Sequence, residues 1–267
     1  MKKLTIYTIL ICAAQMAIGQ NYNAAYVKSL YAKYPIDKND LCANCYIWVN
    51  PYYTSIADIQ KNYPVCEHGV VTSANVQSQE KAKITRKGVF AGWNIVTGGT
   101  RLDEVYSYAN STLKKPIEFA YGHCALAWVL AARDQNGAIF SDTETFGEFM
   151  EWQGQNIGTM IASEDTTRLL LGATLKGVKH SAIVDHIDIW AGCVSSATSK
   201  VYTINSVSVT VPDAVWKILK FGNQTVCYWM PNLNNEVAAL LPKRHITYAN
   251  LIAKLGFDPE KVLPQTN

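Results

Sequence analysis

The sequence predicts an α+β fold, and three observations carry this prediction. The run "KVYTINSVSVTV" from residue 200 alternates polar and apolar side chains, which is the period of a half-buried strand. The run "QNIGTMIASEDTTR" from residue 155, with the apolar residues after it, is typical of a helix that ends near Gly172 and Gly177. Strand-like and helix-like segments are mixed along the chain without the regular alternation of a parallel α/β sheet.

The other elements follow from local patterns. Residues 73–88 are polar and compatible with a helix, and residues 88–99, β-branched and aromatic between glycines, predict a strand. Residues 117–133 form an apolar segment interrupted by Gly122-His123, and an Asn-Gly turn then precedes a second strand, "NGAIFSDTETF". Later, "VPDAVWKIL" leads to a further strand, "TVCYWMPN", and the tail has apolar residues at helical spacing before Gly256.

The amino terminus has the layout of a secretory signal peptide. Two lysines precede an apolar run and then small residues up to Gly19. We therefore assign residues 1–19 to a signal peptide, residues 20–75 to a small cysteine-containing extension, and residues 76–267 to the main domain. This layout predicts secretion or export to a bacterial periplasm. No other segment approaches the roughly eighteen apolar residues that a membrane helix needs.

Composition and charge are those of an ordinary globular protein. Of the 267 residues, 49% are hydrophobic and 17% are charged. Without Lys2 and Lys3 the chain has 22 Lys and Arg against 21 Asp and Glu, a net charge of +1. No global basic field therefore attracts nucleic acid, and any anionic substrate must be held locally.

Six cysteines remain after the signal peptide: Cys42, Cys45, Cys66, Cys124, Cys193 and Cys227. An even set in an oxidising compartment favours disulfides, although the sequence does not fix the pairing. The spacing of Cys42, Cys45, Cys66 and His68 is also compatible with a zinc site.

Four polar residues around the predicted helix are candidates for chemistry. His123 can act as a general base, because an imidazole titrates near neutrality. The amide of Asn156 can cap the helix or bind a hard cation such as Mg²⁺. Glu164 and Arg168 are one turn apart on one face, where they can form a simple ion pair, or can orient water and clamp a phosphate.

These residues resemble a motif of the DNA/RNA non-specific endonuclease family, the ββα-metal or His-Me finger nucleases. That family carries Asp-Arg-Gly-His, then a Thr-Phe-containing strand, then Asn, with Glu eight residues later and Arg four beyond it. Gly122-His123 matches the end of the first block, and Asn156, Glu164 and Arg168 keep the spacing of the last. The segments "VPDAVWKILKF", "CYWMPN" and "ITYANLIAKLGFDP" resemble later blocks of the family.

The resemblance implies a ββα-metal core with a mixed, largely antiparallel sheet flanked by helices. It also implies hydrolysis of DNA, RNA or both, with His123 as general base and Mg²⁺, or Mn²⁺ or Ca²⁺ in its place, held by Asn156. Glu164 would orient water, and Arg168 would offset charge on the phosphate. Little choice between DNA and RNA is expected, since backbone contacts carry no direct base information.

The sequence departs from the family pattern before Gly122. Ala120-Tyr121 replaces the family's Asp-Arg, so a carboxylate and a phosphate-facing arginine are missing. Arg101 and Tyr121 are the candidates for substrate contacts in their place. Cys124, directly after the histidine, is unusual, and is either a small buried hydrophobe or half of a disulfide.

Two other interpretations remain open. A cysteine hydrolase would use Cys124 as nucleophile, with His180, His186 or His245 as base. A non-catalytic nucleic-acid-binding or structural protein on a nuclease fold is favoured by the missing Asp-Arg and the near-neutral charge. The sequence does not determine the oligomeric state.

Overall fold

The structure is a computed structural model of the chain, and it describes residues 32–61, 63–82, 119–123, 148–152, 157–204, 207–233 and 236–265. Its strands are β1 (Ile36–Lys38), β2 (Cys45–Val49), β3 (Tyr53–Asp58), β4 (Tyr63–Thr72), β5 (Phe119–His123), β6 (Glu148–Trp152), β7 (Thr174–Leu175), β8 (Val178–Lys179), β9 (His186–Val194), β10 (Val201–Ile204), β11 (Val207–Thr210), β12 (Ala214–Phe221), β13 (Gln224–Pro231) and β14 (His245–Ile246). Its helices are α3 (Ser73–Ala82), α8 (Ile157–Leu170), the 3-10 helix η1 (Ala238–Arg244), α9 (Tyr248–Leu255) and α10 (Pro259–Val262).

One large sheet organises the described residues, with the strand order β1-β2-β3-β4-β9-β12-β13-β14. Every neighbouring pair in it is antiparallel. The three central strands, β4, β9 and β12, are almost entirely buried, which explains their high content of β-branched and aromatic residues. The expected α+β class, with a largely antiparallel sheet and few helices, is confirmed.

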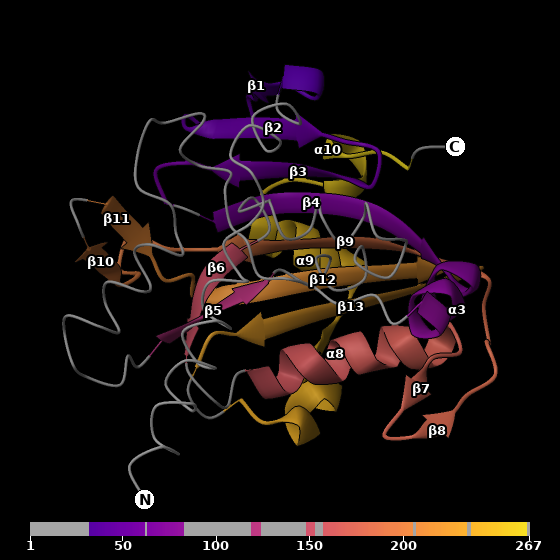
Figure 1. Cartoon of the computed structure of the whole chain (residues 1–267). Coiled ribbons are helices and arrows are strands. Elements are labelled where there is room, and N and C mark those ends of the chain that lie inside the picture. The colour runs from indigo at the N-terminus through magenta and orange to yellow at the C-terminus, as the bar shows by residue number, and fades with distance from the viewer. Residues whose placement is uncertain are drawn as a thin grey trace, which may run out of the picture.

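Each face of the sheet has its own hydrophobic core. Met160 and Leu171, from α8 and the residue after it, belong to the core on one face. Leu251 of α9 and Leu263, just after α10, belong to the core on the other, where the Trp190 indole N–H donates to the Leu263 carbonyl (2.8 Å). Figure 1 shows α8 along one face and α9 and α10 behind the opposite one. Within the described ranges, no helix has both the length and the apolar character needed to cross a membrane.

The segment that the sequence assigns to a small extension contributes strongly to this sheet. Residues 36–72 form β1 to β4, and β4 pairs with β9 over six positions, from Glu67↔Ala191 to Thr72↔His186. Pro64 and a register shift between Ile56 and Ala57 interrupt the alternation of β3 and β4. These irregularities explain why the segment's sequence shows only short periodic stretches.

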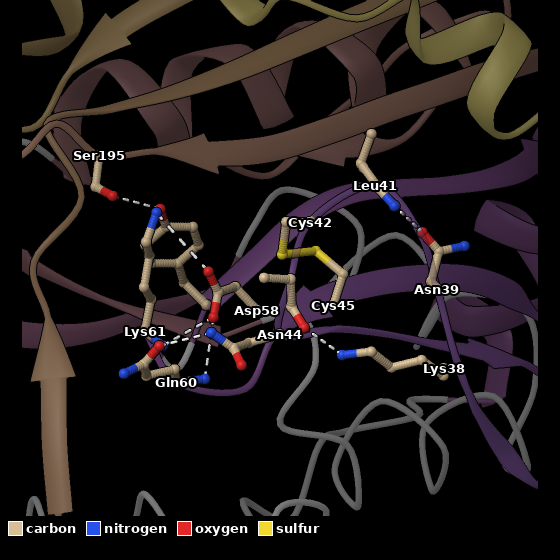
Figure 2. Close-up of a disulfide and its surroundings, with 12 residues drawn as sticks. Lys38, Asn39, Leu41, Cys42, Asn44, Cys45, Asp58, Gln60, Lys61 and Ser195 are labelled. Atoms are coloured by element: carbon tan, nitrogen blue, oxygen red, sulfur yellow. Dashed lines mark hydrogen bonds and ion pairs between the residues drawn. A yellow bond between two sulfur atoms is a disulfide. The ribbon is translucent and has the colours of Figure 1, made fainter.

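The turn between β1 and β2 is closed by a disulfide between Cys42 and Cys45 (Figure 2). Their Cα atoms are 5.0 Å apart, and the Cys45 N–H donates to the Cys42 carbonyl (3.1 Å). The ammonium of Lys38 donates to the Ala43 carbonyl, and the Asn44 side-chain amide donates to Gln60 (2.6 Å). The turn is therefore held by covalent and polar contacts at the sheet edge.

This disulfide decides between the two interpretations of the first cysteines. The Cys42 and Cys45 sulfurs are bonded to each other, Cys66 is a buried free thiol, and the Nε2 atom of His68 lies 3.2 Å from a carboxylate oxygen of Asp188. The four residues therefore do not form a shared zinc site. Cys193 and Cys227 are also buried, and Cys124 lies outside the described residues.

Several predicted elements are confirmed in place. The helix after residue 155 is α8, and Gly172 follows it with a φ of 79°, a left-handed conformation that glycine adopts without strain. The strands from residue 201 form the β10–β11 hairpin, the tail helix is α9, and residues 73–82 form α3. The strands expected at residues 88–99 and 136–146 lie outside the described residues.

The amino-terminal turn of α8 packs tightly against the chain just before η1. An added Cβ atom at Gly158 would lie 2.6 Å from the Ala238 nitrogen and 2.8 Å from the Glu236 carbonyl oxygen. Both contacts are with backbone, which cannot rotate away. Glu236 is itself fully buried and forms an ion pair with Arg244, so this part of the chain is fixed. Only glycine fits at position 158.

We expect replacement of Cys42 and Cys45 by serine to lower the free energy of unfolding by about 2 kcal/mol, the loop-entropy value for so short a closed loop. Urea titration of the two proteins measures this difference. Adding dithiothreitol should destabilise the wild type by a similar amount and leave the double variant unchanged. Equal stability of oxidised wild type and variant would contradict a stabilising role for the disulfide.

We expect Gly158→Ala to lower the free energy of unfolding by roughly 1–3 kcal/mol, the usual range for overpacking. The backbone of α8 or of the segment before η1 must move to admit the new methyl group. Chemical denaturation measures the loss, and Ile161→Ala is the matched control, since Ile161 lies on the same helix with 48% of its surface exposed. A loss for Gly158→Ala no greater than for the control would disprove the close approach.

Candidate functional site

A two-stranded hairpin carries the candidate general base. Strands β5 and β6 pair antiparallel with the register Phe119↔Trp152 to His123↔Glu148, so His123 is the last residue of β5. The hairpin lies outside the main sheet, near the left end of the central strands in Figure 1. For β5 and β6 the structure describes the backbone, which places Tyr121 two positions before His123 on the same strand.

Helix α8 begins five residues after β6 ends, which completes a β-β-α succession. Four of its residues, Thr159, Met160, Ser163 and Thr167, are buried at helical spacing against the sheet. Glu164 and Arg168 are each one position beyond a buried residue and are partly exposed. They therefore lie one turn apart along the flank of α8, as the sequence predicts.

The guanidinium of Arg168 also contacts an acid that the sequence analysis did not single out. Its Nη1 atom lies 3.4 Å from a carboxylate oxygen of Asp165, and both side chains are about one-third exposed, 29% and 34%. At this distance and exposure the pair contributes little to stability. The contact does hold the guanidinium along the flank of the helix.

Buried polar contacts fasten α8 to the sheet. The Lys217 ammonium, on β12, donates to the Ser163 hydroxyl (3.1 Å), and that hydroxyl donates to the Met160 carbonyl (2.7 Å). The Thr167 hydroxyl donates to the Ser163 carbonyl one turn back (3.1 Å). Lys217 and Ser163 both have no exposed surface. The position of Glu164 is therefore set by the residue immediately before it.

Lys217 belongs to a row of residues that crosses the sheet beneath α8. The strand registers align Ser55, Glu67, Ala191, Lys217 and Tyr228 on adjacent strands. Burial raises the pKa of Glu67 well above its usual range, and its carboxyl group accepts a hydrogen bond from the Ser55 hydroxyl (3.2 Å). This row was not predicted from the sequence. Its signal is a lysine between Trp216 and Ile218 in an apolar strand.

The described cysteines lack the properties of an activated nucleophile. Burial raises the pKa of the Cys66 thiol well above its usual range and that of the Cys227 thiol to about 11. A reactive cysteine needs a lowered pKa and access to solvent. His186 and His245 are exposed at the starts of β9 and β14, and His180 is partly exposed in the residues after β8. Cys124 lies outside the described residues, so its pairing with these histidines stays a prediction.

Four of the six sequence-predicted site residues are thus placed in part or not at all. Arg101 and Asn156 lie outside the described residues, and Tyr121 and His123 are placed by their backbone. The described part of the chain holds no cluster of three His, Cys, Asp or Glu side chains able to bind a metal. Glu164 and Arg168 are the predicted site residues whose side chains the structure describes.

Comparison with known proteins identifies the fold. No family model matches the sequence, and no curated protein matches it. Among solved structures, one described as "Crystal structure of the EndoG/EndoGI complex: Mechanism of EndoG inhibition" superimposes with a TM-score of 0.56. The match covers 80% of this chain and 86% of the other, at 14% identity. The large antiparallel sheet, with the β5–β6 hairpin leading into α8, is therefore the EndoG-like ββα-metal fold that the resemblance predicts.

Proposed function

We propose that this chain is an exported, metal-dependent endonuclease that hydrolyses phosphodiester bonds of DNA, RNA or both with little sequence preference. The observation that carries this proposal is the EndoG-like fold, in which the strand ending at His123 leads through β6 to the helix bearing Glu164 and Arg168. Those residue types and their order are the ones that the resemblance implies for phosphodiester hydrolysis.

In this proposal His123 acts as the general base. Its neutral imidazole accepts a proton from a water molecule as the water oxygen attacks phosphorus. The bond between phosphorus and the 3′ oxygen breaks, and that oxygen takes a proton from solvent. The products are a 5′ phosphate and a 3′ hydroxyl, as the resemblance implies. His123 is the last residue of β5 and pairs with Glu148 of β6.

Glu164 and Arg168 act from the flank of α8. The Glu164 carboxylate accepts hydrogen bonds from water and so orients it, and the Arg168 guanidinium donates to the phosphate oxygens as their negative charge grows. Asp165, which lies 3.4 Å from the same guanidinium, limits the directions in which that group can extend. The helix itself is fixed through Ser163 and Lys217, so both groups are held before substrate arrives.

The donor chemistry of the chain fits a hard divalent cation such as Mg²⁺, with Mn²⁺ or Ca²⁺ as substitutes. The amide oxygen of Asn156 is a ligand type that such ions prefer, and the Glu164 carboxylate could orient water around the ion. When bound, the ion would neutralise negative charge on the phosphate. Few protein ligands are required, since Mg²⁺ usually keeps several of its waters.

Substrate contacts are expected to be local, because the net charge after the signal peptide is only +1. Tyr121 is two positions before His123, and alternate residues of a strand share one face, which supports Tyr121 as a phosphate contact beside the base. Arg101 is the second such candidate. Residues 1–19 would direct the protein to the periplasm or outside the cell.

The decisive test is digestion of plasmid DNA and of total RNA by residues 20–267, with Mg²⁺ and with EDTA. We expect nicking and degradation with Mg²⁺, none with EDTA, and a loss of at least 100-fold in rate for His123→Ala, since general-base catalysis typically contributes 10²–10⁴-fold. His186→Ala is the matched control, because His186 is an exposed histidine on β9, and it should keep wild-type activity.

Two other outcomes of this digestion assay would contradict the proposal. Folded wild type and His123→Ala that are equally inactive on both substrates would leave the non-catalytic protein as the interpretation. Hydrolytic activity that survives EDTA but is lost on treatment with a thiol reagent, or with Cys124→Ala, would establish the cysteine hydrolase instead.

The pH profile checks the role of His123 independently. An imidazole with the ordinary pKa of about 6.5 is only about 3% unprotonated at pH 5, so initial rates there should be about 30-fold below the plateau above pH 7.5. The rate should rise with pH, because the base must be neutral. Rates measured at constant ionic strength that instead fall between pH 5 and pH 7.5 would exclude a neutral histidine as the base.

A further inference from the structure

Lys217 is a lysine in the most buried part of the sheet. It lies near the middle of β12, and no part of its surface is exposed. Its neighbours on the adjacent strands in the row beneath α8 are Ala191 and Tyr228. The side chain at Ala191 is small, which leaves room above the sheet for the long side chain of Lys217. The other lysine of β12 that lies nearby, Lys220, is partly exposed and pairs with Glu260 of α10 (2.6 Å) on the opposite face.

The ammonium of Lys217 reaches the helix that carries the proposed site. It lies 3.1 Å from the Ser163 hydroxyl, and Ser163 is followed directly by Glu164. The same hydroxyl donates to the Met160 carbonyl at 2.7 Å, so the contact fixes both the side chain and the preceding turn of α8. One turn later, the buried Thr167 directly precedes Arg168, just as the buried Ser163 directly precedes Glu164.

Burying an ammonium group to attach a helix is energetically unfavourable. Removing a charge from water is unfavourable, and apolar residues of similar volume often replace buried charged groups with no loss of stability. A methionine at position 217 would fill about the same volume within the hydrophobic core. What methionine cannot supply is a directional bond that selects one rotation and one axial position of α8 over its neighbours. Lys217 therefore has the properties of a residue that specifies position.

We infer that Lys217 is a positioning residue for the proposed nuclease site: through Ser163 it sets the rotation and axial position of α8, and so the places of Glu164 and Arg168. This inference rests on the proposed function for its catalytic consequence. The geometric part, a helix held in register by a buried lysine, stands on the contacts alone. Lys217 touches no reacting atom in this proposal and acts only through the helix.

The test compares Lys217→Met, Ser163→Ala and the double variant, with Lys220→Met as the matched control. All four are assayed on plasmid DNA with Mg²⁺, at a temperature well below the unfolding midpoint of each. We expect kcat to fall at least tenfold in Lys217→Met and in Ser163→Ala, with KM changing less than threefold. The double variant should lose no more than either single one, because both remove the same contact. Lys220→Met should stay within twofold of wild type.

A purely structural role for Lys217 gives a different pattern. It would lower the unfolding midpoint while leaving kcat of the folded protein unchanged, or the losses in kcat would multiply in the double variant, and either result overturns the inference. If Lys217→Met does not fold, Ser163→Ala still decides, since it removes the contact from the helix side without leaving a cavity larger than a hydroxyl group.

If the wild-type protein has no nuclease activity, the proposed function is wrong, but the role of Lys217 in positioning α8 can still be tested. Amide hydrogen exchange over residues 159–170 then reports the position of α8 directly. We expect exchange at least tenfold faster in Lys217→Met than in wild type, and unchanged in Lys220→Met. Equal protection of α8 in all three proteins would overturn the inference, whatever the enzyme assays show.

Discussion

The antiparallel pairing of β4, β9 and β12 is the constraint on which the rest of the structure depends. These strands are buried on both faces, so each face must be covered by another layer of secondary structure. Helix α8 covers one face, and α9 and α10 cover the other. The indole of Trp190 illustrates the coupling, since it is fully buried in β9 and donates to the Leu263 carbonyl after α10.

The two faces differ in how they hold their helices. On the face of α9 and α10 the contacts are chiefly apolar, with Leu251 and Leu263 among buried tryptophans. On the face of α8 a polar row, including Glu67 and Lys217, lies within the hydrophobic core. Apolar packing gives affinity between layers but little direction, whereas hydrogen bonds at 2.7–3.1 Å fix orientation. One of these directional contacts runs from the buried Lys217 to the helix that carries the candidate site residues.

The sequence allowed the fold class, α8 and α9 to be predicted, because each depends on local signals. Gly172 and Gly256 mark helix ends through their left-handed backbone, and the alternation from residue 201 is a pure strand period. The spacing of Glu164 and Arg168 likewise follows from helix geometry alone. The large contribution of residues 36–72 to the sheet was not foreseen, since proline and the register shift at Ile56 hide the alternation.

Other parts of the site depend on partners far away in the sequence. Nothing local shows that Lys217 meets Ser163, 54 positions earlier, or that Glu67 shares a row with it. Arg168 contacts Asp165, an acid that the spacing of the motif does not emphasise. Such contacts require knowledge of strand order, and the order β4-β9-β12 is set by pairing between segments that no local pattern connects.

The order of the strands has a consequence for how the chain folds. Glu67 and Ala191 are neighbours in the central sheet although more than one hundred residues separate them, and the β5–β6 hairpin and α8 both lie within that interval. During synthesis β1 to β4 emerge first, and the free edge of β4 must wait for β9. Closing so long a loop is entropically costly and slow, and it leaves an apolar strand edge open to association.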